Sequence, residues 1–84
     1  MFKFKEKEVF QIIEEALELN QGKININSSP DNVSEWDSLG HLNILMLLDK
    51  KLEGKASSVT ELAKAMSVKK IITVLKKNNF YNNI

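Results

Sequence analysis

The chain has 84 residues, of which 43% are hydrophobic and 27% charged, with a net charge of +1 and no cysteine. This length predicts a single domain over residues 1–84, whose small core leaves no room for a large catalytic cleft. The lack of cysteine excludes disulfides and thiolate sites, and His41 is the only histidine. We therefore expect no metal site, no catalytic residues and no enzymatic activity.

The charges are unevenly distributed along the chain. Residues 1–42 hold four lysines and eight acids, whereas residues 43–84 hold eight lysines and three acids. A basic half is one feature of nucleic-acid-binding proteins, but here no arginine and no interleaved aromatic residues accompany the lysines. We favour a solvated lysine-rich surface and expect no nucleic-acid partner.

No apolar run approaches the roughly 20 residues that a membrane-spanning helix needs. Residues 1–8 alternate in charge and lack the apolar segment of a signal peptide. We expect a cytoplasmic monomer that does not bind membranes.

A first helix is predicted from Lys5 to Leu19, with Asn20 and Gly22 as its stop. Its apolar positions follow helical spacing and fall on one face. That face consists of Val9, Ile12, Ile13, Ala16 and Leu17. The solvated side is predicted to carry Glu14, Glu15 and Glu18.

Residues 20–36 form a long connection that is rich in Asn, Ser, Pro and Asp. Ile24 and Ile26 are its main apolar anchors. A structureless connection of this length is uncommon in a small domain and is often functional. Trp36 ends it, and we favour a core anchor over a partner contact for this indole.

A second helix is predicted from Asp37 or Ser38 to Leu52, with Asp37 as N-cap and Gly54 as stop. A short third helix, from Thr60 to Ala65 with Thr60 as cap, and a last helix from Ser67 to Lys77 follow. Residues 78–84 are expected to be frayed. The fold class is therefore all-α: a small four-helix bundle with a long first loop, a short third helix and a core within about residues 5–77.

The second helix is apolar on two sides. At 100° per residue, one cluster spans about 100° and is assigned to the core. This core cluster consists of Ile44, Leu45, Leu48 and Leu52. Leu39, Leu42 and Met46 fall on the opposite side, where we expect an exposed stripe that docks partners. The alternative is a helix that is buried nearly all round.

The informative motif lies where the long connection meets this helix. It reads Glu35-Trp36-Asp37-Ser38-Leu39-Gly40-His41-Leu42. A serine in the first turn of a helix is exposed, and the free amides and dipole there favour a negative group. A phosphodiester on Ser38 would lie where an anion is tolerated.

The Asp37-Ser38-Leu39 core resembles that of acyl carrier proteins, and the wider string is similar to stand-alone carriers of specialised pathways. The long loop, the apolar second helix, the short third helix and Ser67-Val68 match in order and spacing. The resemblance implies that Ser38 carries 4′-phosphopantetheine, which a phosphopantetheinyl transferase takes from coenzyme A. It also implies that acyl-activating, acyltransferase or synthase enzymes load and use the thioester.

The predicted docking residues are Asp37, Leu39, Leu42, Asn43, Met46 and Lys50. Carriers of fatty acid synthesis usually have a strongly acidic second helix, whereas Lys50 and Lys51 stand here where acids are expected. This departure predicts dedicated partners with a less basic docking patch. For His41, we favour a partly buried packing role over contact with the phosphate, and Gly40 is expected to leave room for a close approach.

Two alternatives remain open at this level. One is an aminoacyl or peptidyl carrier, although such carriers typically have Gly-Gly before the His/Asp-Ser pair, unlike Trp36-Asp37-Ser38. The other is an unmodified helical adaptor, which the basic second half favours. The cargo and the pathway are not encoded in any motif.

Overall fold

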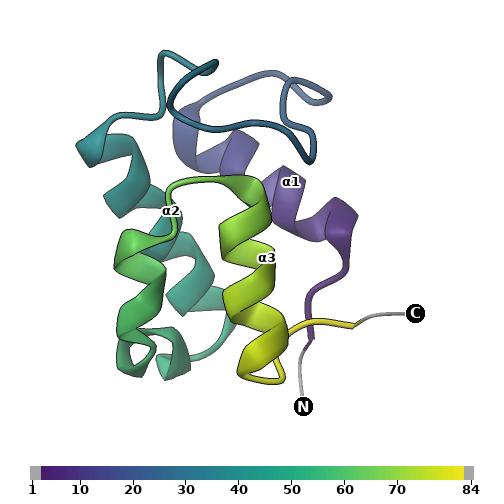
Figure 1. The fold of residues 1–84 in the computed structure, drawn as a ribbon, viewed down its shortest axis with the longest axis vertical. Coiled ribbons are helices and arrows are strands. Elements are labelled where there is room, and N and C mark those ends of the chain that lie inside the picture. The colour runs from purple at the N-terminus through teal and green to yellow at the C-terminus, as the bar shows by residue number, and fades with distance from the viewer. Residues whose placement is uncertain (1–2, 83–84) are drawn as a thin grey trace.

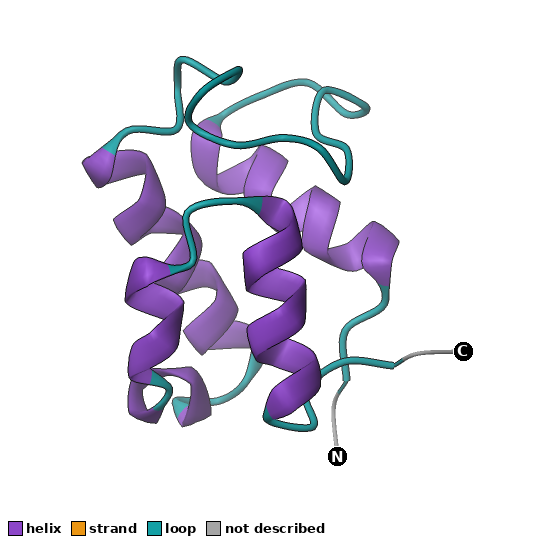
Figure 2. Ribbon diagram, viewed as in Figure 1, coloured by secondary structure: helices purple, strands orange, loops and turns teal. Residues whose placement is uncertain are grey.

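A computed structural model describes residues 3–82 of the chain. It contains three α-helices and two 3-10 helices, and no described residue forms a strand (Figures 1 and 2). The elements are α1 (Glu6–Leu17), α2 (Ser38–Lys51), η1 (Lys55–Ser58), η2 (Thr60–Lys64) and α3 (Val68–Lys77). The prediction of an all-helical protein is confirmed. Within the described range, no helix is long and apolar enough to cross a membrane.

The first α-helix is shorter than predicted at both ends. The Lys5 amide donates a 2.8 Å hydrogen bond to the Glu8 carboxylate, which places Lys5 before the helix. Glu18 ends the helix in the left-handed conformation, with φ 57°, and its amide bonds the Glu14 and Glu15 carbonyls. The predicted end at Leu19 is therefore wrong by two residues. The helix ends at Leu17 because Glu18 is its C-cap, and the predicted stop residues Asn20 and Gly22 lie farther along the chain.

The predicted short third helix is present, and its type is 3-10. The segment forms 3-10 helix η2, which is preceded by the unpredicted 3-10 helix η1. Thr60 is not the cap, because Val59 occupies that position without a side-chain bond. The Ser57 and Ser58 hydroxyls bond the carbonyls of Gly54 and Lys55, at 2.8 and 2.9 Å. Such local bonds compete with α-helix formation, which explains the tighter, shorter turns.

All five helical elements contribute to one hydrophobic core. Its largest fully buried side chains are Trp36, Phe4, Ile13, Ile44, Leu48, Leu62, Ile71, Leu75, Val9 and Val68. The core face predicted for α2 is confirmed for Ile44, Leu48 and Leu52, whereas Leu45 is half-buried. Of the two predicted anchors of the long connection, Ile24 is buried and Ile26 is half-buried.

The connection over residues 18–37 lies across one end of the helices (Figure 1). Glu14 of α1 holds it in place, since its carboxylate accepts hydrogen bonds from the amides of Gly22 and Ile24, at 2.9 and 3.0 Å. Glu14 is only 5% exposed, so its predicted place on the solvated side of α1 is wrong. Glu15 and Glu18 are exposed, as predicted.

The same connection is bonded to α3. Ser28 is buried, and its carbonyl accepts from the Val68 amide at 3.1 Å. The Ser28 hydroxyl accepts from the Asn25 amide at 3.0 Å, which closes a turn within the connection. Ser67 caps α3, because its hydroxyl accepts from the Lys70 amide at 3.1 Å. The start of α3 is thus fixed by its own cap and by the long connection.

The two ends of the described chain lie side by side (Figure 1). Phe4 is fully buried; its amide donates to the Phe80 carbonyl, and its carbonyl accepts from the Asn82 amide, both at 2.8 Å. These backbone bonds connect Phe80 and Asn82, which belong to the tail that was predicted to fray, to Phe4. Residues 83–84 of the predicted tail lie outside the described residues.

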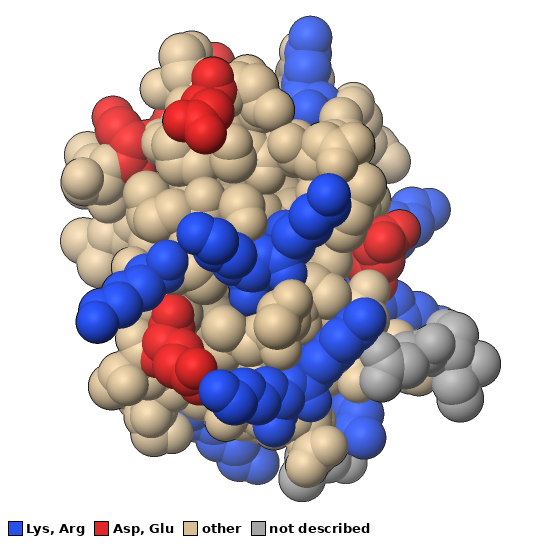
Figure 3. Space-filling model, viewed as in Figure 1, with Lys and Arg blue, Asp and Glu red and all other residues tan. Residues whose placement is uncertain are grey.

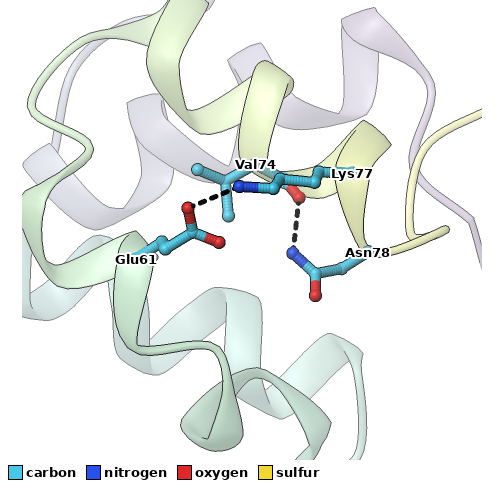
Figure 4. A network of polar contacts seen from close by, with 4 residues as sticks. All are labelled: Glu61, Val74, Lys77 and Asn78. Atoms are coloured by element: carbon cyan, nitrogen blue, oxygen red, sulfur yellow. Dashed lines mark hydrogen bonds and ion pairs between the residues drawn. The ribbon is translucent and has the colours of Figure 1, made fainter.

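Lysines dominate the face of the molecule that α3 and the 3-10 helices form (Figure 3). α3 carries four lysines and no acid, at positions Lys69, Lys70, Lys76 and Lys77. The Lys77 ammonium forms an ion pair with the Glu61 carboxylate of η2, at 3.0 Å (Figure 4). Next to this pair, the Asn78 side-chain amide donates a hydrogen bond to the Val74 carbonyl. Both side chains of the ion pair are more than half exposed, so this contact contributes little stability.

Replacing Glu14 with glutamine tests its role in holding the connection. The uncharged amide oxygen accepts more weakly than a carboxylate, so we expect Glu14→Gln to lower the free energy of unfolding by about 1 to 3 kcal/mol. Glu15→Gln, on the exposed side of the same helix turn, should change it by less than about 0.5 kcal/mol. Urea unfolding measures both, and equal losses in the two variants would contradict the assignment.

Candidate functional site

Ser38 is the first residue of α2 and is exposed. The preceding Asp37 is the N-cap, as predicted, because its carboxylate accepts from the Gly40 amide at 2.8 Å. The Asp37 carbonyl accepts from the His41 amide, also at 2.8 Å, which closes the first helical turn. The serine hydroxyl is thus presented to solvent at a helix end whose geometry is fixed by its neighbour.

Gly40 allows the first turn of α2 to pack tightly against α1 and the long connection. A Cβ atom at this position would lie 2.5 Å from the Glu35 carbonyl oxygen and 2.7 Å from Leu17 Cδ2. Both distances are shorter than van der Waals contact, and the carbonyl belongs to the backbone. The expectation that Gly40 leaves room for a close approach is confirmed.

Trp36 and His41, which lie on either side of Ser38 in the sequence, form a buried polar pair. Trp36 is 1% exposed and His41 is 4% exposed, and the indole Nε1 lies 3.0 Å from His41 Nδ1. An indole nitrogen only donates, so Nδ1 must accept and the ring proton must be on Nε2. The predicted core anchor at Trp36 is confirmed, and the predicted packing role of His41 is confirmed with a specific tautomer added.

His41 also reaches a segment that is distant in the sequence. Its Nε2 lies 2.9 Å from the carbonyl oxygen of Leu62 in η2. Because Nδ1 accepts from Trp36, the Nε2–H group is the donor in this bond. A chain of two buried hydrogen bonds therefore joins the end of the long connection, α2 and η2.

The predicted exposed stripe on α2 is present. Leu39, Leu42 and Met46 are 66%, 51% and 61% exposed. They are the exposed large hydrophobic residues of the part of the chain that the structure describes. Ser38, Leu42 and Met46 follow at intervals of four, so they lie on one side of the helix. The stripe therefore begins beside the serine hydroxyl.

The predicted polar rim of the stripe is exposed as well. Asp37, Asn43 and Lys50 all face solvent. Asp49, the one acid within α2, is half-buried, and its carboxylate accepts from the Ser57 amide of η1 at 2.9 Å. This carboxylate is therefore engaged in holding η1, which leaves the rim even less acidic than the sequence indicates.

An apolar cavity of about 350 Å³ lies between α2 and the 3-10 helices. Leu45 and Met46 of α2 form one wall, and Val59, Leu62 and Ala63 form the opposite one. Met46 belongs to both the stripe and the cavity, so the apolar surface that begins beside Ser38 continues into this space. Among residues 3–82, no group of three or more His, Cys, Asp or Glu side chains is placed to hold a metal ion.

Sequence reasoning missed the cavity and the Leu62 partner of His41. The helical wheel placed His41 toward the core but could not name an acceptor 21 residues away. The polar partner of Trp36 was also missed, although a spacing of five residues across a helix N-terminus was a usable signal. The cavity depends on the 3-10 geometry, which no periodicity in the sequence indicates.

Comparisons with models of known families, with curated proteins and with solved structures found no match to this chain. The function must therefore be inferred from the residues and geometry of the chain itself.

Substituting Gly40 by alanine tests the close packing under Ser38. Alanine ordinarily stabilises a helix relative to glycine by up to about 1 kcal/mol, but the clash with Glu35 and Leu17 should reverse the sign. We expect Gly40→Ala to lower the free energy of unfolding by about 1 to 3 kcal/mol. Asn43→Ala, at an exposed position of the same helix, should be neutral or stabilising, and chemical denaturation compares the two. A stable Gly40→Ala protein would show that the helices do not approach so closely.

Proposed function

We propose that this protein is an acyl carrier that holds acyl intermediates as thioesters on a 4′-phosphopantetheine arm attached to Ser38. The observation that carries the proposal is the exposed serine at the first position of α2, from which an exposed apolar stripe runs to an apolar cavity. The motif around Ser38 supports it, because Asp37-Ser38-Leu39 resembles the attachment motif of carrier proteins.

The geometry at Ser38 fits a phosphodiester. The hydroxyl oxygen is exposed, so a phosphopantetheinyl transferase can reach it without unfolding the helix. The amides of Ser38 and Leu39 belong to the first turn of α2, where no acceptor within the helix is available to them. These amides and the positive end of the helix dipole favour an anion on the serine. When bound, the arm supplies the thiol that forms the thioester; the protein itself catalyses no step.

The arrangement of helices supports the finer fold assignment. We infer a small four-helix bundle in which η1 and η2 together take the place of the third helix. They pack against α2, and η2 also packs against α3. The long connection over one end of the bundle places Trp36 and Ser38 at that end, in the manner the resemblance implies.

The exposed stripe is the surface that we propose partner enzymes contact. Leu39, Leu42 and Met46 present a contiguous apolar surface that the fold leaves uncovered. Asp37, Asn43 and Lys50 surround it with mixed charge. A rim of this kind fits partners with a less basic docking surface than fatty acid synthase enzymes have, because rim charge mainly tunes association rate and partner choice.

The cavity is proposed to shelter part of the acyl chain. It is apolar, about 350 Å³ in volume, and shares Met46 with the stripe. Ser38 and Met46 are eight residues apart on one helix, which is about 12 Å at 1.5 Å per residue. A flexible arm on Ser38 therefore has its cargo within reach of the cavity.

The attachment site is tested by the intact mass of the protein after incubation with coenzyme A and a broad-specificity phosphopantetheinyl transferase. We expect the mass to rise by one phosphopantetheine group in the unmodified protein and in Ser34→Ala, an exposed serine of the same region. Ser38→Ala should show no addition. Folded protein that takes up no group from more than one transferase would refute the carrier assignment.

The docking surface is tested by the rate of phosphopantetheine transfer. We expect Leu42→Ala to lower kcat/KM by about fivefold or more, because a buried interface leucine contributes on the order of 1 kcal/mol. Gln11→Ala, an exposed position on α1, should leave kcat/KM unchanged. Thermal unfolding should be similar for both variants, since both side chains are exposed. A normal rate for Leu42→Ala would show that partners bind elsewhere.

A further inference from the structure

His41 is the point where three parts of the fold meet through buried polar contacts. Its Nδ1 accepts from Trp36 Nε1 at 3.0 Å, and its Nε2–H donates to the Leu62 carbonyl at 2.9 Å. The indole and imidazole rings are nearly parallel, with an angle of 16° between their planes and 6.1 Å between their centroids. Because both ring nitrogens are engaged, the imidazole is held in one orientation, and that orientation directs a donor at η2.

The other bonds that hold η2 in place are weak. Within the segment, the Leu62 amide bonds the Val59 carbonyl and the Ala65 amide bonds the Leu62 carbonyl, each at 3.1 Å across three residues. Bonds of this 3-10 type have poor geometry. The ion pair from Glu61 to Lys77 is exposed and stabilises little. The bond from His41, in contrast, is buried and joins η2 directly to α2.

The residues at the two ends of η2 depart from helical backbone geometry. Val59 has φ −98° and ψ 82°, and Ala65 has φ −84° and ψ 73°, so both leave the helical region. Rotation at a few residues of this kind moves a segment as a unit. Val59, Leu62 and Ala63 form the wall of the cavity that faces Leu45 and Met46, so a movement of η2 changes the width of the cavity.

We propose that the hydrogen bond from His41 to Leu62 is a latch that holds η2 against α2 and thereby limits the length of apolar chain that the cavity accepts. His41 is a positioning residue in this role, because it acts through the η2 backbone. The inference rests on the proposed function for the identity of the cargo, an unbranched acyl chain. The latch itself is a property of the unmodified protein.

Trp36 connects the latch to the attachment site. It lies two residues before Ser38 and orients the imidazole through its N–H group.

Two substitutions of His41 separate its two bonds. Asparagine places a carbonyl oxygen near the position of Nδ1, so His41→Asn keeps an acceptor for Trp36 but does not reach Leu62. Glutamine places an amide nitrogen near the position of Nε2, so His41→Gln keeps a donor for the Leu62 carbonyl. The two variants are similarly polar, and each serves as the control for the other.

Hydrogen exchange of the unmodified protein tests the latch without any cargo. In His41→Asn we expect the Ala65 amide, which bonds the Leu62 carbonyl, to exchange about five- to tenfold faster, as the loss of one hydrogen bond implies. Ile13 in α1 and Ile71 in α3 should be protected as in the original protein, and His41→Gln should keep Ala65 slow. Equal acceleration at all three amides would show a general loss of stability and overturn the latch, as would unchanged exchange at Ala65.

Acyl chains of increasing length test the consequence for cargo. A phosphopantetheinyl transferase attaches the acyl-phosphopantetheine group of butanoyl-, octanoyl- or dodecanoyl-coenzyme A to Ser38 of the protein and of both variants. The rate at which hydroxylamine cleaves each thioester is then measured. We expect His41→Asn to protect longer chains than the original protein and His41→Gln to resemble the original. If the cleavage rate depended on chain length in the same way in the original protein and both variants, the proposed limit on chain length would be overturned. If Ser38 takes no acyl-phosphopantetheine at all, the proposed function fails, while the exchange measurement still decides the latch.

Discussion

The structure depends on one constraint: its small core must accommodate a large share of non-helical backbone. The long connection and the 3-10 helices carry amides and carbonyls that no α-helix satisfies. Three buried polar side chains bond such groups: Glu14 accepts from two amides of the connection, Ser28 from a third, and His41 donates to η2. Among the described residues, every buried side-chain nitrogen or oxygen has a partner. The irregular segments, and with them the candidate site, are therefore held by specific bonds as well as by apolar burial.

The second helix shows how much of the site local sequence determines. Periodicity separates its core side from its exposed stripe, and the N-cap at Asp37 follows from residue type alone, so Ser38 and its surroundings could be predicted. The role of Glu14 could not, because the two amides that donate to its carboxylate lie in a loop whose path no periodic pattern describes. The same holds for the bond from His41 to Leu62 and for the pairing of Phe4 with residues 80–82. Each of these joins positions far apart in sequence, and each is decided by tertiary packing.

The choice of 3-10 over α-helix geometry has a similar origin and a larger effect. The Ser57 and Ser58 hydroxyls bond nearby carbonyls, and an apolar space remains between α2 and the two 3-10 helices. An apolar space that is bordered by weakly bonded backbone can change its volume at low cost, whereas the α-helical part of the core cannot. We therefore expect changes of shape at the cavity, which borders the exposed stripe at Met46.

The burial of Trp36 has a spectroscopic consequence. It is the only tryptophan of the chain, so the ultraviolet emission of the protein comes from one indole in one environment. That indole is shielded from water, hydrogen-bonded to an imidazole and placed two residues from Ser38. Emission wavelength and quenching by iodide will therefore report on this end of the molecule without an attached dye, in any mixture whose other components lack tryptophan.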